Sequence, residues 1–431
     1  MNGRLFTAND FRQPSTMGFL SMQTFRISKE WNSKAHTLFL EGKMQEAVNL
    51  ALKEAGGKPG RFVQAAYYCF VLGDYGSALM FLKLYLKHFP RDIQILNNMT
   101  ACCTRLHRYE EAVFHAQQVL LLDPDSFSAF DALAHALGKL GDMDGARKAG
   151  TKALLLKDLA ALRHAPNTNP IPEEEVHEIL HIAGTKKKVC AFSLFGSAPR
   201  YLRGALYNVL IGKELYPEWT MRFYMDGTVP RELKDALESL DAEVLEQEDD
   251  QPRDVKLCWR FLVASDPEVG RFMVRDCDSA FSLREVLVVD EWLESGKLFH
   301  VIHDWHTHTA LVLAGLWGGV SGVLPDMLSM LDGFFASNRT ITTNVDQFFL
   351  AQCVWPAIKE SCLVHDRFFD AFSPRRPPLK HFRTRKDHIG ADRFVTDKEW
   401  QDRCLAPWIR ELPCLAVQMT RKREYKSGFD E

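Results

Sequence analysis

The pattern of polar turn residues and small apolar residues repeats along the first half of the chain. A turn, a large side chain and then an alanine recur every 34 residues, at residues 73–78, 107–112 and 141–146. A less regular copy occupies residues 42–47, and two prolines, Pro90 and Pro124, keep the same spacing. This period is typical of helix–turn–helix units that bury their apolar faces against one another. We therefore predict an α-helical solenoid over residues 30–160, preceded by an extension over residues 1–29.

These residues resemble the tetratricopeptide-repeat family over about residues 30–158. The small residues Ala35, Ala66 and Ala134 fall in the first helix of a unit, where paired helices approach closely. His107, where glycine is usual, and Asp158, where proline would fall, depart from the family pattern. Such an array is either a packed solenoid without a ligand or a groove for a protein partner or for self-association, and the residues leave both open.

The second half has a different pattern. From Lys188, compact apolar runs alternate with helical stretches: residues 189–195, 221–226 and 242–245 are typical of strands, and residues 201–215 and 231–240 of helices. Alternation of this kind predicts a mostly parallel sheet with covering helices. Ligands of such sheets gather at the carboxyl ends of the strands, so polar residues directly after apolar runs are the candidates for a site.

The two halves are joined by a proline-rich breaker at residues 165–172 and a short helix, which together form a linker over residues 161–187. The helix carries His177, Glu178 and His181 in the H-E-x-x-H arrangement of zinc peptidases. The extended motif would place a third histidine at position 187, which is Lys187. A zinc metallopeptidase therefore remains an alternative enzyme class, although its third zinc ligand is missing.

Composition narrows the class of protein. The chain has 431 residues, 46% of them hydrophobic and 25% charged, and a formal net charge of −3, which is the balance of a globular protein of two domains. The first thirty residues lack the apolar stretch of a secretory signal, and the longest charge-free apolar run, residues 310–324, is shorter than the ~20 residues of a membrane helix. We expect a cytoplasmic protein whose ten cysteines are reduced and mostly buried.

The most informative polar residues follow the apolar run at residues 271–275. Asp276 and Asp278 form an Asp-x-Asp motif where this predicted strand ends. Two carboxylates one residue apart can both reach one Mn²⁺ or Mg²⁺ ion, which prefers oxygen ligands and leaves room for diphosphate oxygens. The pair predicts a metal site, and the cation would neutralise the charge of a departing nucleoside diphosphate.

With this motif, residues 188–370 resemble the A-type fold of metal-dependent glycosyltransferases. The resemblance implies that Asp276 and Asp278 hold the metal and the diphosphate of a UDP- or GDP-sugar donor. It also implies nucleotide contacts from the first strand, through Phe192, Ser193 and Phe195. Arg260 precedes the motif and either faces the diphosphate or is a solvated helix charge.

Two later residues extend the candidate site through the same resemblance. Asp346 lies in an Asp-Gln segment that resembles the one facing sugar or acceptor in several such transferases, or it caps a helix. His365 matches in kind the late histidine that some members use as a third metal ligand.

Asp304 follows a strand predicted to end at His303, in a stretch with four histidines between residues 300 and 308. We interpret that stretch as an acceptor pocket with Trp305 and Trp317 as sugar platforms, in preference to a zinc site. The glycines around Trp317 either let the backbone approach the substrate or form a mobile lid.

The last segment, residues 376–431, contains a basic cluster at Arg376, Lys380, Arg383, Arg385 and Lys386. It is either a solvated surface or a binding site for diphosphate or for a nucleic-acid or other anionic acceptor, although no known nucleic-acid-binding motif accompanies it.

The predicted fold class is thus α plus α/β: a tetratricopeptide solenoid followed by a Rossmann-like mixed α/β domain of the A-type glycosyltransferases over residues 188–375. The predicted function is transfer of a sugar from a nucleotide-sugar donor to an acceptor that the residues do not identify. The alternative is a repeat scaffold with an inactive α/β domain.

Overall fold

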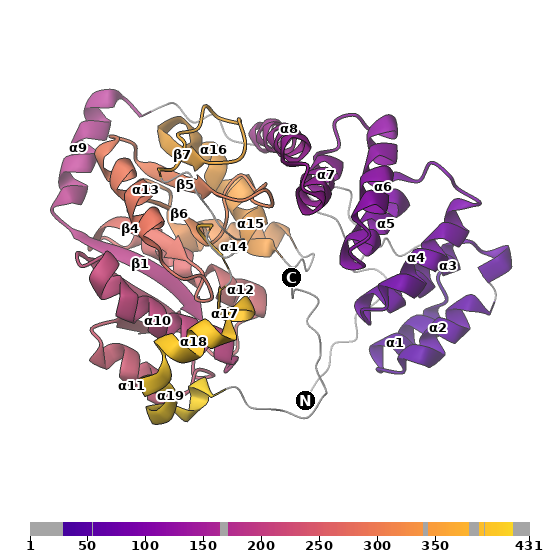
Figure 1. The fold of residues 1–431 in the computed structure, drawn as a ribbon, viewed down its shortest axis with the longest axis horizontal. Helices are drawn as coiled ribbons and strands as arrows, with labels where there is room; N and C mark the ends of the chain where they lie inside the picture. Colours follow the sequence, from indigo (N-terminus) through magenta and orange to yellow (C-terminus); the bar gives the residue numbers. More distant parts are fainter. Residues whose placement is uncertain are drawn as a thin grey trace.

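The computed structural model describes residues 29–53, 55–163, 171–338, 344–378, 388–391 and 393–416. It contains an array of helices followed by an α/β domain (Figure 1). The predicted N-terminal extension up to residue 28, most of the proline-rich breaker and the basic residues Lys380, Arg383, Arg385 and Lys386 lie outside the described residues. No helix among those described is long and apolar enough to cross a membrane.

The array consists of helix pairs that pack in sequence: α1 (Ser33–Leu40), α2 (Met44–Leu52), α3 (Gly60–Val71), α4 (Tyr75–Leu86), α5 (Ile93–Arg105), α6 (Tyr109–Leu122), α7 (Phe127–Leu140) and α8 (Met143–Leu162). The turns between paired helices use left-handed backbone at Gly42 (φ 79°), Gly73 (φ 77°), His107 (φ 56°) and Gly141 (φ 86°). His107 therefore adopts the conformation that glycine provides in the other units, at a steric cost that glycine avoids.

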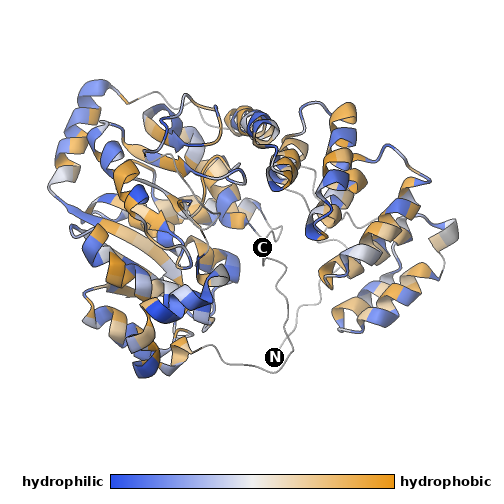
Figure 2. Ribbon diagram, in the orientation of Figure 1, coloured by the Kyte–Doolittle hydropathy of each residue, from blue (hydrophilic) through white to orange (hydrophobic). Residues whose placement is uncertain are grey.

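The small residues of the array lie where the helices meet. Ala35, Ala66 and Ala134 are fully buried, which confirms the predicted helix contacts. Figure 2 shows hydrophobic and hydrophilic residues interspersed along each of these helices, as expected for elements that bury part of their surface against neighbours. The prediction of a helical-repeat array is confirmed.

The second half forms a seven-stranded sheet in the order β3-β2-β1-β4-β6-β5-β7. Its strands are β1 (Lys187–Leu194), β2 (Trp219–Met225), β3 (Glu243–Glu246), β4 (Val269–Arg275), β5 (Phe299–His303), β6 (Leu316–Val320) and β7 (Cys362–Asp366). Of these seven strands only β6 runs antiparallel to its neighbours, so the prediction of a mostly parallel sheet is confirmed.

Both faces of the sheet are covered. Along β1, Cys190 and Phe192 point to one face, and Val189 and Ala191 point to the other. The first face packs against α10 (Pro199–Leu215), α11 (Arg231–Ser239) and part of α13 (Leu283–Glu294). The second packs against α9 (Glu173–Gly184), the 3₁₀ helix η2 (Trp259–Ser265), α14 (Met327–Ser337), α15 (Val345–Phe349), the π-helix η3 (Leu350–Val354) and α16 (Trp355–Ile358). The short helix α12 (Arg253–Cys258) leads into η2.

The C-terminal helices belong to the same domain. Phe394, Leu405 and Leu415, in and around α17 (Arg393–Thr396), α18 (Lys398–Cys404) and α19 (Ala406–Glu411), join the core beneath α10. Arg203 of α10 donates a hydrogen bond of 2.7 Å to the carbonyl of Leu415. The α/β domain, predicted over residues 188–375, therefore includes helices as far as about Ala416.

The array is not separated from the α/β domain, although the proline-rich breaker predicts separation. Asp158 of α8 accepts hydrogen bonds from Trp355 Nε1 (2.8 Å) and Lys359 Nζ (2.9 Å). Lys157 of α8 donates to the carbonyl of Thr309 at 2.8 Å, and Leu154 joins the core of the α/β domain. The last repeat thus forms part of the packing that supports the sheet.

Candidate functional site

The sheet order creates one place suited to a ligand. The chain moves from β1 outward to β2 and β3, and then returns to place β4 on the opposite side of β1. Ligands of open α/β sheets bind at such a switch point, beyond the carboxyl ends of the two adjacent strands. In this protein those ends are the loop after β1, at residues 195–198, and the turn after β4, at residues 276–279.

Asp276 and Asp278 lie in that turn, where the motif predicted them. The Asp276 side chain is 45% exposed and the Asp278 side chain 19% exposed, so both carboxylates are accessible. Arg200, in the first turn of α10, lies 3.8 Å from the Asp278 carboxylate. The N-terminus of α10 follows the loop after β1, which brings backbone N–H groups and a guanidinium to the same edge of the sheet, as anion sites require.

Arg260 joins two of the predicted site residues. Its guanidinium, 4% exposed, forms ion pairs with Asp276 and, at 3.1 Å, with Asp346 of α15. Burial by itself would lower the pKa of Arg260, but the two carboxylates more than reverse this effect and its pKa is raised. Burial raises the pKa of Asp346, and Arg260 only partly offsets that rise. Arg260 is therefore not a solvated helix charge.

The three first-strand residues that were expected to contact the nucleotide lie in different surroundings. Ser193 Oγ accepts the backbone N–H of Arg260 at 3.0 Å, and Phe195 packs edge to face against Trp259, so both lie beside the arginine. Phe192 is fully buried and stacks on Phe223 in the core, on the face covered by α10. The structure therefore gives the Phe192 side chain a packing role and leaves Ser193 and Phe195 near the site.

Helix α10 holds the Asp-x-Asp turn through residues that the sequence reasoning missed. The Asn208 side chain donates to the carbonyl of Ser279 at 2.7 Å and accepts from the backbone N–H of Phe281 at 3.2 Å. One helical turn earlier, Gly204 allows close approach: a Cβ there would lie 1.8 Å from the carbonyl oxygen of Cys277. A glycine and a buried asparagine four residues apart in an otherwise apolar helix face were the available signal.

A second glycine contacts the motif from the other side. A Cβ at Gly315 would lie 2.0 Å from Asp276 Oδ2, so the residue before β6 leaves space for this carboxylate. The following glycines, Gly318 and Gly319, belong to β6 and pack against Trp292 and Phe299. They lie in a fully buried strand, so of the two alternatives for these glycines the mobile lid is wrong.

Asp304 is fully buried and directly follows β5. Its carboxylate pairs with Arg284 Nη2 at 2.7 Å and accepts the backbone N–H of Ile389 at 2.8 Å. Burial raises the pKa of Asp304 to about 7, although Arg284, the Ile389 N–H and Arg367 each oppose this rise. The structure places Asp304 in a supporting position, and the acceptor role predicted for it is not apparent from its contacts.

The structure does not bring His365 to the aspartates. It lies on β7, and two strands, β6 and β5, separate β7 from β4. At roughly 4.8 Å per strand this is about 14 Å, beyond the reach of a shared metal ion. Its Nδ1 lies 2.8 Å from His300 Nε2 and its Nε2 lies 2.9 Å from a Glu291 oxygen, so both ring nitrogens already have partners.

The remaining predictions concern the histidines of α9, the histidines around Asp304, and Trp317. His177, Glu178 and His181 lie on α9, and among the described residues no third ligand atom completes a cluster there. His308 Nδ1 accepts the backbone N–H of Asp304 at 3.0 Å, which gives this histidine a structural contact. Trp317 is buried between Phe261 and Phe272, so its prediction as a sugar platform is wrong.

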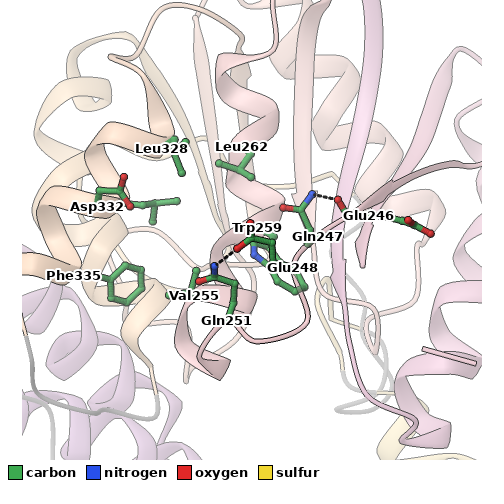
Figure 3. A pocket seen from close by; sticks show the side chains of 11 residues that line it. Glu246, Gln247, Glu248, Gln251, Val255, Trp259, Leu262, Leu328, Asp332 and Phe335 are labelled. Atoms are coloured by element: carbon green, nitrogen blue, oxygen red, sulfur yellow. Dashed lines mark hydrogen bonds between the residues drawn. The ribbon is translucent and has the colours of Figure 1, made fainter. Parts of the chain in front are cut away.

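A pocket of ≈ 380 Å³ lies beside η2 (Figure 3). Trp259 lines it, and its other lining residues are Glu246, Gln247, Glu248, Gln251, Val255, Leu262, Leu328, Leu331, Asp332 and Phe335. Among the described residues, three carboxylates and no cationic side chain line this pocket, so it does not suit a diphosphate. We place the candidate donor site at the Asp-x-Asp turn instead.

No protein-family model matches the chain. Among solved structures, MamA from Desulfovibrio magneticus RS-1 is similar at 19% identity and a TM-score of 0.27, covering 35% of this chain and 79% of that one. A mutant of the Thermobaculum terrenum O-GlcNAc transferase is similar at 16% identity and a TM-score of 0.31, covering 56% of this chain and 44% of that one. At these TM-scores neither similarity bears on the activity.

Proposed function

We propose that the protein is a metal-dependent glycosyltransferase that takes its sugar from a UDP- or GDP-sugar. The observation that carries the proposal is the position of Asp276 and Asp278 at the switch point between β1 and β4, with Arg260 linking Asp276 to Asp346. The accessible carboxylates of Asp276 and Asp278 favour a divalent cation, and the guanidinium of Arg200 beside Asp278 favours a diphosphate.

The residues fit such a cation because accessible carboxylate oxygens are the donors that Mn²⁺ and Mg²⁺ prefer. Asp276 and Asp278 would hold the ion, which when bound supplies positive charge for the leaving diphosphate. Arg200 and the N-terminus of α10 would bind diphosphate oxygens, and Asn208 and Gly204 would fix the turn. Asp346, held by Arg260, would face the sugar or the acceptor.

The test is a panel of nucleotide sugars with Mn²⁺, with hydrolysis or transfer and the melting temperature as readouts. We expect one donor to be consumed and to raise the melting temperature. Asp278→Asn should abolish both effects and preserve the fold, because it keeps the side-chain volume and removes the charge that holds the cation. Asp241→Asn, at an exposed ion pair with Lys213, is the matched control and should behave like the wild type.

A second candidate has its own observation. Arg260 already pairs with Asp276, and such a pair can satisfy the carboxylate without a metal ion. The chain would then be a repeat scaffold whose α/β domain is inactive. If no donor is consumed and none shifts the melting temperature, this second function replaces the first.

A further inference from the structure

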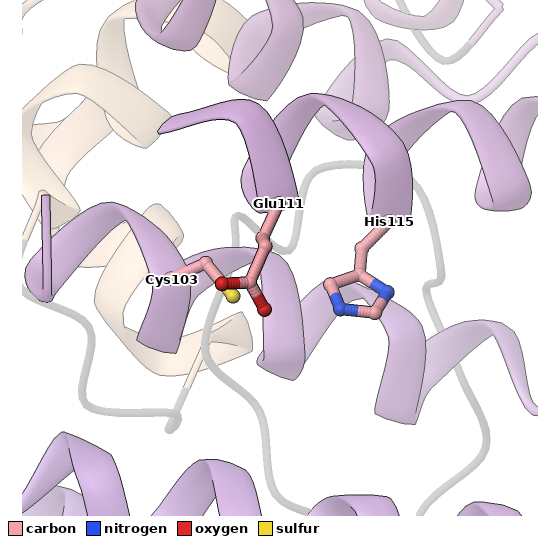
Figure 4. Close-up of side chains that lie close together, drawn as sticks. All are labelled: Cys103, Glu111 and His115. Atoms are coloured by element: carbon pink, nitrogen blue, oxygen red, sulfur yellow. The ribbon is translucent and has the colours of Figure 1, made fainter. Parts of the chain in front are cut away.

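Three side chains with metal-binding atoms meet inside the repeat array, away from the Asp-x-Asp turn. Cys103 lies near the end of α5, and Glu111 and His115 lie one helical turn apart on α6, facing it (Figure 4). The ligand atoms of the three all lie within 4.8 Å of one another. Ligand atoms at about 2.0–2.3 Å from a tetrahedral zinc ion are roughly 3.5 Å from one another. Side-chain rotations that move these atoms by about 1 Å would therefore bring them to zinc-binding distances.

The histidine of this group is buried and turns one ring nitrogen towards the other two residues. His115 is only 8% exposed, and in Figure 4 its Nε2 faces Glu111 and Cys103 while its Nδ1 points away from them. Nε2 is therefore the nitrogen that would bind a metal ion, and Nδ1, which has no hydrogen-bond partner among the described residues, would carry the proton. A neutral imidazole binds zinc through one ring nitrogen and keeps its proton on the other.

We propose that Cys103, Glu111 and His115 bind one zinc ion, with water in the fourth position. A thiolate, an imidazole and a carboxylate are the three ligand types that zinc takes in proteins. The Glu111 side chain is 39% exposed and gives the ion a path from solvent, whereas Cys103 is fully buried. The ion would tie α5 to α6 within one repeat and so stabilise the array.

Zinc binding must displace the thiol proton of Cys103 and the two cationic side chains that pair with Glu111. Zinc binds a cysteine as its thiolate, so the proton of the buried Cys103 thiol would leave to solvent as the ion binds its sulfur. Glu111 pairs with Arg108 and, at 3.7 Å, with Lys83, whose side chains are 46% and 48% exposed. Exposed pairs of this kind contribute little, so both cations can turn to solvent. Thiolate, carboxylate and zinc together are then neutral.

The experiment uses the full chain, freed of metal with a chelator and titrated with Zn²⁺. We expect one zinc per chain, release of about one proton per zinc and a higher melting temperature. Tighter binding at higher pH follows because a proton is released. With Co²⁺ in place of zinc, a thiolate-to-cobalt charge-transfer band in the near ultraviolet should appear.

Three variants identify the ligands. Cys103→Ser should remove the charge-transfer band, and His115→Gln and Glu111→Gln should each weaken zinc binding at least tenfold. The Glu111 side chain lies on the helix surface, so Glu111→Gln remains informative if the Cys103 or His115 variant fails to fold. Cys404→Ser, at an exposed cysteine elsewhere, is the control and should bind zinc like the wild type.

Unchanged zinc affinity in the Glu111 and His115 variants, or a cobalt complex without the thiolate band, would overturn the proposal. His177→Ala separates it from binding by the histidines of α9, because loss of zinc in that variant alone also contradicts it. The donor screen described above reports on the other domain, so either proposal can fail without the other.

Discussion

The carboxylate of Asp304 accepts a hydrogen bond of 2.8 Å from the backbone N–H of Ile389, 85 residues further along the chain. The next residue, Gly390, accepts the hydroxyl of Ser279 at 3.3 Å, and Ser279 directly follows the Asp-x-Asp motif. Residues 388–391 therefore connect the end of β5 to the turn after β4. Asp304 thus contributes to the candidate site through the backbone that it holds.

Asp304→Asn should change how stability depends on pH. The carboxyl has a pKa of about 7 in the folded state, against about 3.9 when unfolded, so the folded protein binds more protons between these values. Stability from this group is therefore full below about pH 4 and falls as the pH rises towards about 7. Measured by urea unfolding, the wild type should lose about 1–3 kcal/mol relative to the variant between about pH 5 and about pH 8. Parallel pH profiles would contradict this prediction.

Ser279→Ala removes the hydroxyl that connects the Asp-x-Asp turn to Gly390. One hydrogen bond is lost and no charge changes, so stability should fall by about 1 kcal/mol. If the turn positions the donor, the transfer rate should fall up to about tenfold, with the larger effect on kcat. Steady-state kinetics with the donor from the screen provide the measurement. An unchanged rate would mean that this contact does not position the motif.

Gly204→Ala should disturb the motif through packing. The added methyl would lie 1.8 Å from the Cys277 carbonyl oxygen, so α10 or the turn must shift, at a cost of about 1–3 kcal/mol. Gly333→Ala is the matched control, because Gly333 is also inside a helix and a Cβ there has nothing within 4 Å. The control should be stabilised by about 0.5–1 kcal/mol. Equal melting temperatures for the two variants would contradict the proposed close approach.

Arg260→Gln should leave the buried Asp346 carboxylate without its ion pair. Breaking a buried pair from one side costs about 3 kcal/mol or more, although the half-exposed Asp276 contributes little of this. Adding Asp346→Asn removes the unpaired buried charge. The double variant should therefore lose less unfolding free energy than the two single variants lose together. A double-mutant cycle by chemical unfolding measures this coupling, and simple additivity would count against it.

Asp158→Ala should loosen the contact between the array and the sheet. It leaves Trp355 Nε1 and Lys359 without their carboxylate, and the Asp158 side chain is 13% exposed, so we expect a loss of about 1–3 kcal/mol. Asp125→Ala, at an exposed pair with Lys152, should change stability by less than about 0.5 kcal/mol. Thermal unfolding distinguishes the two, and a destabilised Asp125 variant would question the argument from burial.

The array could be predicted well because the sequence features that specify it lie close together along the chain. A left-handed turn, a small residue and a fixed period of 34 residues are each visible in a short stretch of chain. The positions of Asp276 and Asp278 were also predictable, because a polar pair after an apolar run marks the end of a strand. His107 shows the limit, since its left-handed backbone depends on the repeat geometry and not on its own preference.

The rest depends on contacts between distant segments. Asn208 lies 71 residues from its partner Ser279, and no local pattern joins them. The family resemblance implied a nucleotide contact for Phe192, and the sequence could not correct this, because a strand buried on both faces has no polar alternation to show which side chains face the helices. His365 was expected near the aspartates through the family resemblance, whereas the order of strands in the sheet places it elsewhere.

The packing of α8 against the sheet has a practical consequence for dissecting the molecule. A fragment cut at the proline-rich breaker would lose Leu154 and Gly150 from beneath the α/β domain, and Gly150 lies directly against the Phe369 ring. The exposed ring and the stranded Trp355 indole would favour aggregation. We expect a fragment that begins at Phe127, and so keeps α7 and α8, to be more soluble than one cut at the breaker about forty residues later.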